Sequence, residues 1–160
     1  MSMRSTRDGV GLVGWVALVF LVAAAGGYAT SLSVQDWYPT LARPALNPPE
    51  AVFGPVWTVL FALMAVAAWR VWRRVGFLGA PVAMGLFLAQ LVLNLGWSVL
   101  FFGMQRPDLA LIEILILWPL ILATLIAFWR HDRIASGLLV PYFVWVGFAI
   151  YLNAAIVVLN

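Results

Sequence analysis

The chain has 160 residues, of which 65% are hydrophobic and 9% are charged. Soluble domains carry about 25% charged residues, so this chain has too few to cover a surface that faces water. It has no cysteine and one histidine, which excludes disulfides and any Cys-based or multi-His metal site within one subunit. We therefore expect a membrane protein with no metal site. Its net charge of +3 is a topology signal rather than a nucleic-acid footprint.

Five apolar runs are long enough to cross a bilayer, at about residues 9–31, 51–70, 79–102, 108–129 and 134–159. A spanning helix needs roughly 20 residues, because each residue adds about 1.5 Å across a core of about 30 Å. The runs predict an all-α polytopic membrane protein, a single five-helix transmembrane domain over residues 1–160. The first run, which follows Arg4 and Arg7, is also open to interpretation as a secretory signal peptide.

The segment between the first two runs, residues 36–49, reads DWYPTLARPALNPP and holds four prolines. Proline restricts φ and lacks an amide hydrogen, so this loop is stiff and cannot continue a helix. Trp37 and Tyr38 give the loop an apolar side. We interpret it as a lid over one end of the bundle, the alternative being a plain connector with interfacial aromatics.

Arginines are distributed unevenly between the two sides of the predicted bundle. The side with Arg43 and Arg106 also carries the lid. The side with the N-terminus carries the other seven of the nine, which are Arg4, Arg7, Arg70, Arg73, Arg74, Arg130 and Arg133. The positive-inside rule therefore predicts a cytoplasmic N-terminus and a lid on the outer side.

Seven of the nine tryptophans fall into two groups. One group lies beside the basic connections, as expected of an interfacial belt: Trp15, Trp69, Trp72 and Trp129. The other group lies on three helix faces predicted from helical spacing, each of which carries one tryptophan. These faces are Trp57, Phe61 and Met64; Gln90, Asn94, Trp97 and Phe101; and Tyr142, Trp145, Ala149 and Asn153. Such stripes are commonly plain core. In lipid, however, helices usually pack through small residues, so facing stripes of large rings predict a cavity for a flat apolar ligand.

Two further patterns concern helix contacts. Asn94 is expected to face the bundle interior, either toward a ligand or in a satisfied interhelical hydrogen bond. Gly85, Ala89 and Gly96 share the opposite face of the third helix, which suits close contact with another helix. Glu113, within the fourth run, is interpreted as a structural residue near a helix N-terminus that reaches the interface, the alternative being a functional role.

Four motifs occur in order on the predicted elements: DWYPTLARPALNPP, FGPVWTVLF, LNLGWSVLFFG and VPYFVWVGFAIYLN. With them the chain resembles the translocator protein family, also called tryptophan-rich sensory proteins or peripheral-type benzodiazepine receptors. The resemblance implies a five-helix bundle in a bacterial cell membrane, a homodimer, and binding of porphyrins such as protoporphyrin IX. The ligand residues that it implies are Trp37, Tyr38, Pro48, Trp57, Phe61, Asn94, Trp145 and Ala149. The aromatic stripe of the third helix predicts Trp97 as a further ligand residue. The small-residue face of the same helix, with Gly85, Ala89 and Gly96, is the expected dimer interface.

The resemblance leaves several functions open. The first is a receptor or sensor for tetrapyrrole sensing, regulation or transport, which needs no cofactor. The second is a light- or oxygen-dependent porphyrin-degrading enzyme, in which Trp37 and Trp145 would act. The third is a structural subunit without a ligand. The sequence shows no general base beside a nucleophile, which counts against ordinary catalysis.

Two positions depart from the family pattern. Leu46 stands where relatives commonly have tryptophan, and no basic residue follows Tyr151, so a sterol motif is incomplete. The first departure predicts a lid that closes less tightly on a ring. The second leaves sterol binding open.

Overall fold

The computed structural model describes residues 3–160, and within that range all of its regular structure is helical. The long helices are α1 (Met3–Ser31), α2 (Glu50–Gly79), α3 (Pro81–Ser98), α4 (Pro107–Trp129) and α5 (Arg133–Leu159). A short 3-10 helix, η1 (Tyr38–Thr40), lies in the first loop, and a π-helical segment, η2 (Val99–Gly103), extends α3. Five spans are long and apolar enough to cross a membrane, which confirms the predicted bundle.

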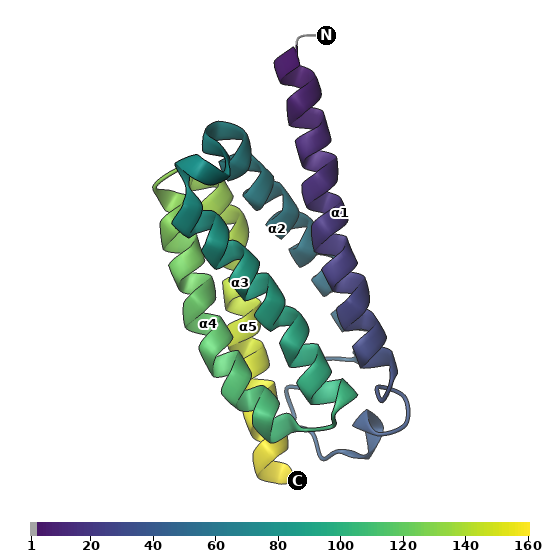
Figure 1. The fold of residues 1–160 in the computed structure, drawn as a ribbon. Helices are drawn as coiled ribbons and strands as arrows, with labels where there is room; N and C mark the ends of the chain where they lie inside the picture. The colour runs from purple at the N-terminus through teal and green to yellow at the C-terminus, as the bar shows by residue number, and fades with distance from the viewer. Residues whose placement is uncertain (1–2) are drawn as a thin grey trace.

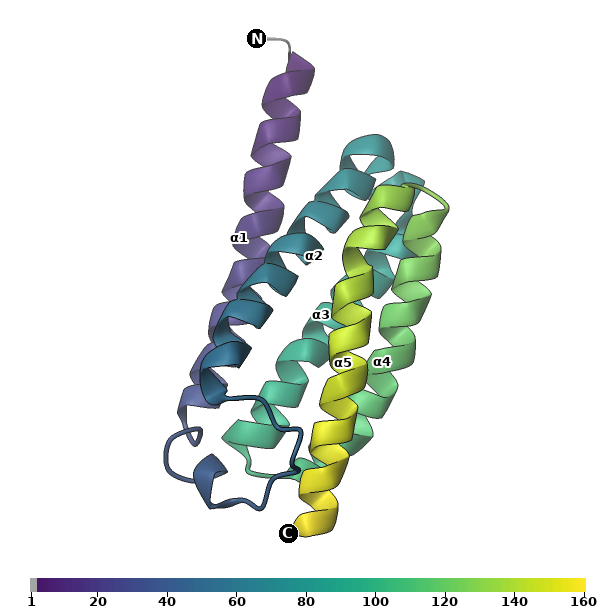
Figure 2. The ribbon, with the colours of Figure 1, turned by 180° about the vertical axis from the view of Figure 1, so that it is seen from behind.

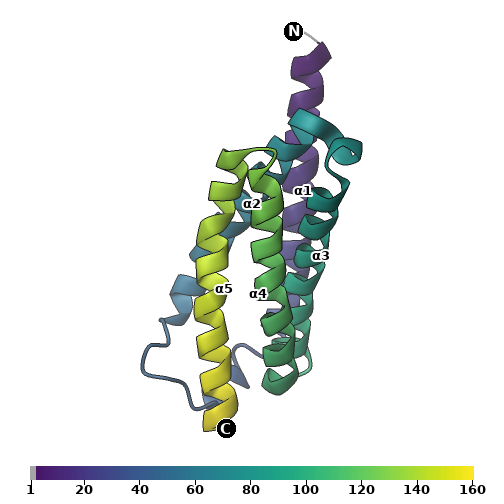
Figure 3. The ribbon, with the colours of Figure 1, turned by 90° about the vertical axis from the view of Figure 1, so that its left-hand side faces the viewer.

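The helices form one bundle (Figures 1, 2 and 3). Around the bundle, each helix contacts the next in the order α1, α2, α5, α4 and α3, and α3 in turn contacts α1. The N-terminus and the α2–α3 and α4–α5 connections lie at one end, which we call the basic end (Figure 1). The first loop, residues 32–49, and the C-terminus lie at the opposite end, which we call the lid end (Figure 2). The first turns of α1 extend beyond the other helices (Figure 1).

The second helix is longer than the sequence predicts. It was expected to end near residue 70, but α2 continues to Gly79. Gly76 interrupts it with φ 67° and ψ −175°, a positive φ that glycine adopts without a Cβ penalty. Arg70, Arg73 and Arg74 therefore lie on the last turns of a helix rather than in a loop. They remain at the basic end, so the uneven distribution of charge is unchanged.

Asp132 joins α2 to the turn between α4 and α5. Its Oδ1 accepts hydrogen bonds from the backbone nitrogens of Ile134 and Ala135 at 2.9 and 3.0 Å and so caps α5. Its Oδ2 lies 3.0 Å from Arg70 Nη2 and 3.1 Å from Arg74 Nε. Burial works to raise the pKa of this carboxyl, but the Ala135 amide and the two guanidinium groups together hold it below its usual range.

The packing at the basic end corrects one prediction about the tryptophans. Trp15 was expected in the interfacial belt, but it is only 6% exposed and meets Phe87 edge-on, with ring centroids 5.7 Å apart. A side chain on α1 that faces α3 is covered by protein rather than by headgroups. Trp129 does have the exposed position expected of a belt residue, and the guanidinium carbon of Arg133 lies 5.1 Å from its ring centroid.

Candidate functional site

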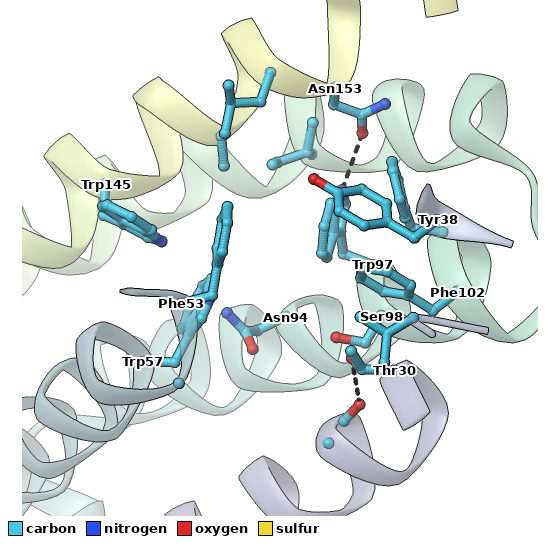
Figure 4. A pocket seen from close by; sticks show the side chains of 18 of the residues that line it. Thr30, Tyr38, Phe53, Trp57, Asn94, Trp97, Ser98, Phe102, Trp145 and Asn153 are labelled. Carbon is cyan, nitrogen blue, oxygen red and sulfur yellow. Dashed lines mark hydrogen bonds between the residues drawn. The ribbon is translucent and has the colours of Figure 1, made fainter. Parts of the chain in front are cut away.

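A cavity of about 300 Å³ lies in the lid half of the bundle (Figure 4). All five helices, the first loop and η2 contribute to its wall. This volume is at the lower end of the range of small-molecule pockets, which is about 300–1,000 Å³. The cavity predicted from the aromatic stripes is therefore present, and it lies beneath the first loop as expected.

Aromatic pairs form opposite parts of the wall. Phe53 of α2 meets Trp145 of α5 edge-on with centroids 5.9 Å apart, and Trp57 lies beside them (Figure 4). Across the cavity, Trp97 of α3 stacks on Phe101 at 4.9 Å. Ring faces and edges at these distances favour a flat apolar guest, because aromatic pairs attract in offset and edge-to-face geometries.

Buried amides tie α3 to α5 beside the cavity. Asn94 Nδ2 donates to the Tyr142 hydroxyl at 3.0 Å, and that hydroxyl donates to Gln90 Oε1 at 2.8 Å. All three side chains are buried. Asn94 therefore makes the interhelical hydrogen bond that was one of its two predicted roles, and it also lies on the cavity wall.

A second amide connects the same two helices to the start of α4. Trp97 Nε1 donates to Asn153 Oδ1 at 3.0 Å, and Asn153 Nδ2 donates to the backbone oxygen of Pro107 at 2.9 Å. The hydrogen bond sets the orientation of the indole ring, because a tryptophan N–H in an apolar environment needs an acceptor. Trp97 thus presents a ring in a defined orientation to the cavity.

The first loop is attached to the bundle at several points. The Tyr38 ring is 6% exposed, lines the cavity and packs against the Phe102 ring of η2 with centroids 5.6 Å apart, while its hydroxyl donates to Asn47 Oδ1 within the loop at 3.2 Å. Asn160, at the C-terminus, accepts from the backbone nitrogen of Ala42 at 2.9 Å and donates to its oxygen at 3.0 Å. The loop therefore lies across the mouth of the cavity, consistent with its interpretation as a lid.

The structure places most of the predicted ligand residues on this wall. Those on the wall are Tyr38, Trp57, Phe61, Asn94, Trp97, Trp145 and Ala149. Trp37 lies behind it and meets Phe101 edge-on at 5.8 Å, while Pro48 lines a shallow hollow on the adjoining surface. That any of them binds a ligand stays a prediction.

Sequence reasoning missed part of the wall. The α1 side was not predicted, and it consists of Ala23, Gly26, Gly27 and Thr30. The signal for it in the sequence is the run of small residues AAAGG, residues 23–27, within the first apolar run. Small residues there leave room for the cavity to reach α1.

Glu113 is buried in the bundle and does not reach the membrane interface as predicted. It was interpreted as reaching the interface, but it is 9% exposed, and neither carboxyl oxygen has a hydrogen-bond partner among the described residues. A Cβ on Gly96 of α3 would lie 3.6 Å from its Oε1. Gly96 therefore borders the chain's own α3–α4 contact, while Gly85 and Ala89 face outward.

Comparisons with known proteins agree with this architecture. The TspO/MBR family model matches residues 15–159. The tryptophan-rich protein TspO of Chlorobaculum tepidum is 44% identical over 149 residues, covering 91% of this chain and 92% of its own. The tryptophan-rich sensory protein of Cereibacter sphaeroides is 38% identical over 91% of this chain and 92% of its own. The human translocator protein is 36% identical over 73% of this chain and 70% of its own.

Replacing Asn94 with leucine should lower the free energy of unfolding by about 0.6 kcal/mol, and by no more than about 1.7 kcal/mol, because interhelical hydrogen bonds in membranes have this magnitude. Tyr142 keeps its bond to Gln90 in this variant. A double-mutant cycle with Tyr142→Phe, followed by unfolding in mixed micelles, measures the coupling between Asn94 and Tyr142. If the effects of the two substitutions on the free energy of unfolding simply add, the bond does not contribute to stability.

Proposed function

The chain belongs to the TspO/MBR family, and from this premise we propose that it is a membrane receptor or sensor that binds tetrapyrroles such as protoporphyrin IX in the cavity. It is an integral multi-pass membrane protein. The observation that carries the proposal is the aromatic wall, in which Trp57, Trp97 and Trp145 border one space beneath the lid.

The shape and chemistry of the wall support a flat ring as ligand. Phe53 and Trp145 lie on one side of the cavity, with Trp97 and Phe101 on another. Each aromatic contact contributes about 0.5–1.5 kcal/mol beyond the burial of apolar surface. The amides of Asn94 and Asn153 provide a small number of polar groups on an apolar wall, as is usual for small-molecule sites.

Titration of the purified protein with protoporphyrin IX should quench tryptophan fluorescence. Trp145→Ala should weaken binding by about twofold to tenfold, which is the stacking contribution expressed as an affinity ratio. Trp129→Ala is the matched control, because Trp129 is exposed at the basic end. Equal affinities in the wild type and the Trp145 variant would remove Trp145 from the site, and absence of quenching in the wild type would overturn the function.

The same titration separates receptor from enzyme when it is repeated under light. Loss of porphyrin absorbance that depends on Trp37 and Trp145 would favour the degrading enzyme. Stable absorbance in darkness and in light supports a receptor.

We propose that the basic end faces the cytoplasm of a bacterial cell and that the lid faces outward. Six of the arginines whose side chains are described support this: Arg7, Arg70, Arg73, Arg74, Arg130 and Arg133 lie at the basic end. Side chains are described from Thr6 onward, so Arg4 lies outside this count.

Single cysteines test the orientation, because the chain has none of its own. Thr6→Cys and Ala45→Cys are both at exposed positions, at opposite ends of the molecule. A membrane-impermeant maleimide should label Ala45→Cys on intact spheroplasts and Thr6→Cys only after permeabilisation. The reverse pattern would invert the topology.

We propose that the protein is a homodimer through the outward face of α3. Gly85 and Ala89 are exposed there, and a Cβ on Gly85 would meet no atom within 4 Å. Two such faces allow close backbone approach, on which helix association in lipid depends.

Gly85→Leu combined with Ala89→Leu should therefore shift the detergent-solubilised protein from dimer to monomer, as measured by light scattering. Gly14→Leu combined with Ala17→Leu on α1 is the control, since these positions are also exposed. A dimer that persists in the α3 variant would assign the interface to another surface. Porphyrin binding should be unchanged, because the cavity is on the other side of α3.

A further inference from the structure

The cavity meets the outer surface at Glu50, the first residue of α2. Among the wall residues that the structure describes, Glu50 is the only charged one. The same side chain lines a shallow hollow on the surface of the lid, together with Arg43, Pro44, Asn47, Pro48, Pro49 and Ala51. A ligand in the apolar cavity with a chain that extends outward would therefore pass Glu50.

Arg43 lies at this junction. Its Nη1 is 3.1 Å from Glu50 Oε1, and its guanidinium carbon lies 5.2 Å from the centroid of the Tyr38 ring, which lines the cavity. Both charged side chains are partly exposed, 31% for Arg43 and 52% for Glu50. The contact with Glu50 uses one nitrogen of the guanidinium, whereas this group binds a carboxylate best through two parallel N–H bonds.

We propose that the site selects ligands that join a flat apolar body to a carboxylate, with Arg43 binding the carboxylate and Glu50 competing for Arg43. This inference rests on the proposed function and specifies the chemistry of its ligand. The body of the ligand lies in the cavity, and its carboxylate replaces Glu50 beside the Arg43 guanidinium. Glu50 disfavours anions that do not reach Arg43, because like charges at short distance repel.

Replacement of Glu50 by a ligand carboxylate does not require the lid to open. An exposed ion pair is weak because water screens it and both side chains lose freedom when they pair. The lid keeps its other attachments, which are the bond from Ser33 Oγ to the backbone oxygen of Phe102 and the two bonds between Asn160 and Ala42. Exchange at Arg43 is therefore a local event at the cavity mouth.

Protoporphyrin IX and its dimethyl ester provide a matched pair of probes, since they share the ring and differ in charge. Arg43→Gln should weaken binding of the acid by a factor on the order of fivefold, the upper range for one partly exposed charge pair, and should leave the ester within about twofold. Glu50→Gln should strengthen binding of the acid and leave the ester unchanged. Both affinities are measured by quenching of tryptophan fluorescence.

A second ion pair at the lid end provides the control. Arg106 and Asp108 are exposed and in contact, and neither lines the cavity. Arg106→Gln and Asp108→Asn make the same changes of charge on the same side of the membrane. These variants should bind acid and ester as the wild type does, which separates a local contact from the general field of the surface.

The outcomes distinguish this inference from the proposed function. Equal losses for acid and ester in Arg43→Gln would show that Arg43 only holds the lid, and would overturn the inference alone. If Arg106→Gln and Arg43→Gln weakened binding of the acid equally, this result would also overturn the inference. A wild-type protein that binds neither probe would overturn the proposed function, and this inference with it.

Discussion

Hydrogen bonds between buried side chains hold α3, α4 and α5 together on one side of the cavity. In lipid no hydrophobic force draws helices to each other, so close packing and polar contacts must do so. The Tyr142 hydroxyl bridges Asn94 and Gln90, and Asn153 bridges Trp97 and the start of α4. Because these contacts hold three helices in register, the other side of the bundle can leave a space unfilled.

The space exists because the helices around it contribute side chains of unequal size. Large rings from α2, α3 and α5 meet small residues on α1, where Gly26 lies close enough to α3 that a Cβ would be 3.4 Å from Ser98 Oγ. Close approach of α1 at that glycine closes the bundle. Rings of fixed shape cannot collapse into the remaining volume without leaving their rotamers, which explains why the cavity persists.

The two ends of the bundle have different chemistry. At the basic end, Asp132 brings two arginines of α2 to the cap of α5, and Trp69 Nε1 donates to the backbone oxygen of Asp8 at 2.8 Å. At the lid end, a proline-rich loop is attached to the bundle by the Tyr38 ring, which packs on Phe101 and Phe102, and by Asn160. The basic end thus joins the helices through polar contacts, whereas the cavity lies at the lid end.

The sequence by itself determined the five helices, the covering loop and the inward face of α3 with Asn94. These follow from span length, proline chemistry and helical periodicity, which are local properties of the chain. The tertiary structure decided which helices are neighbours, and several features depend on that alone. They include the burial of Trp15 against Phe87 and of Glu113 against α3, and the contact of Arg43 with Glu50. Periodicity gives the direction of each face relative to its own helix, but the partner of that face is set by packing.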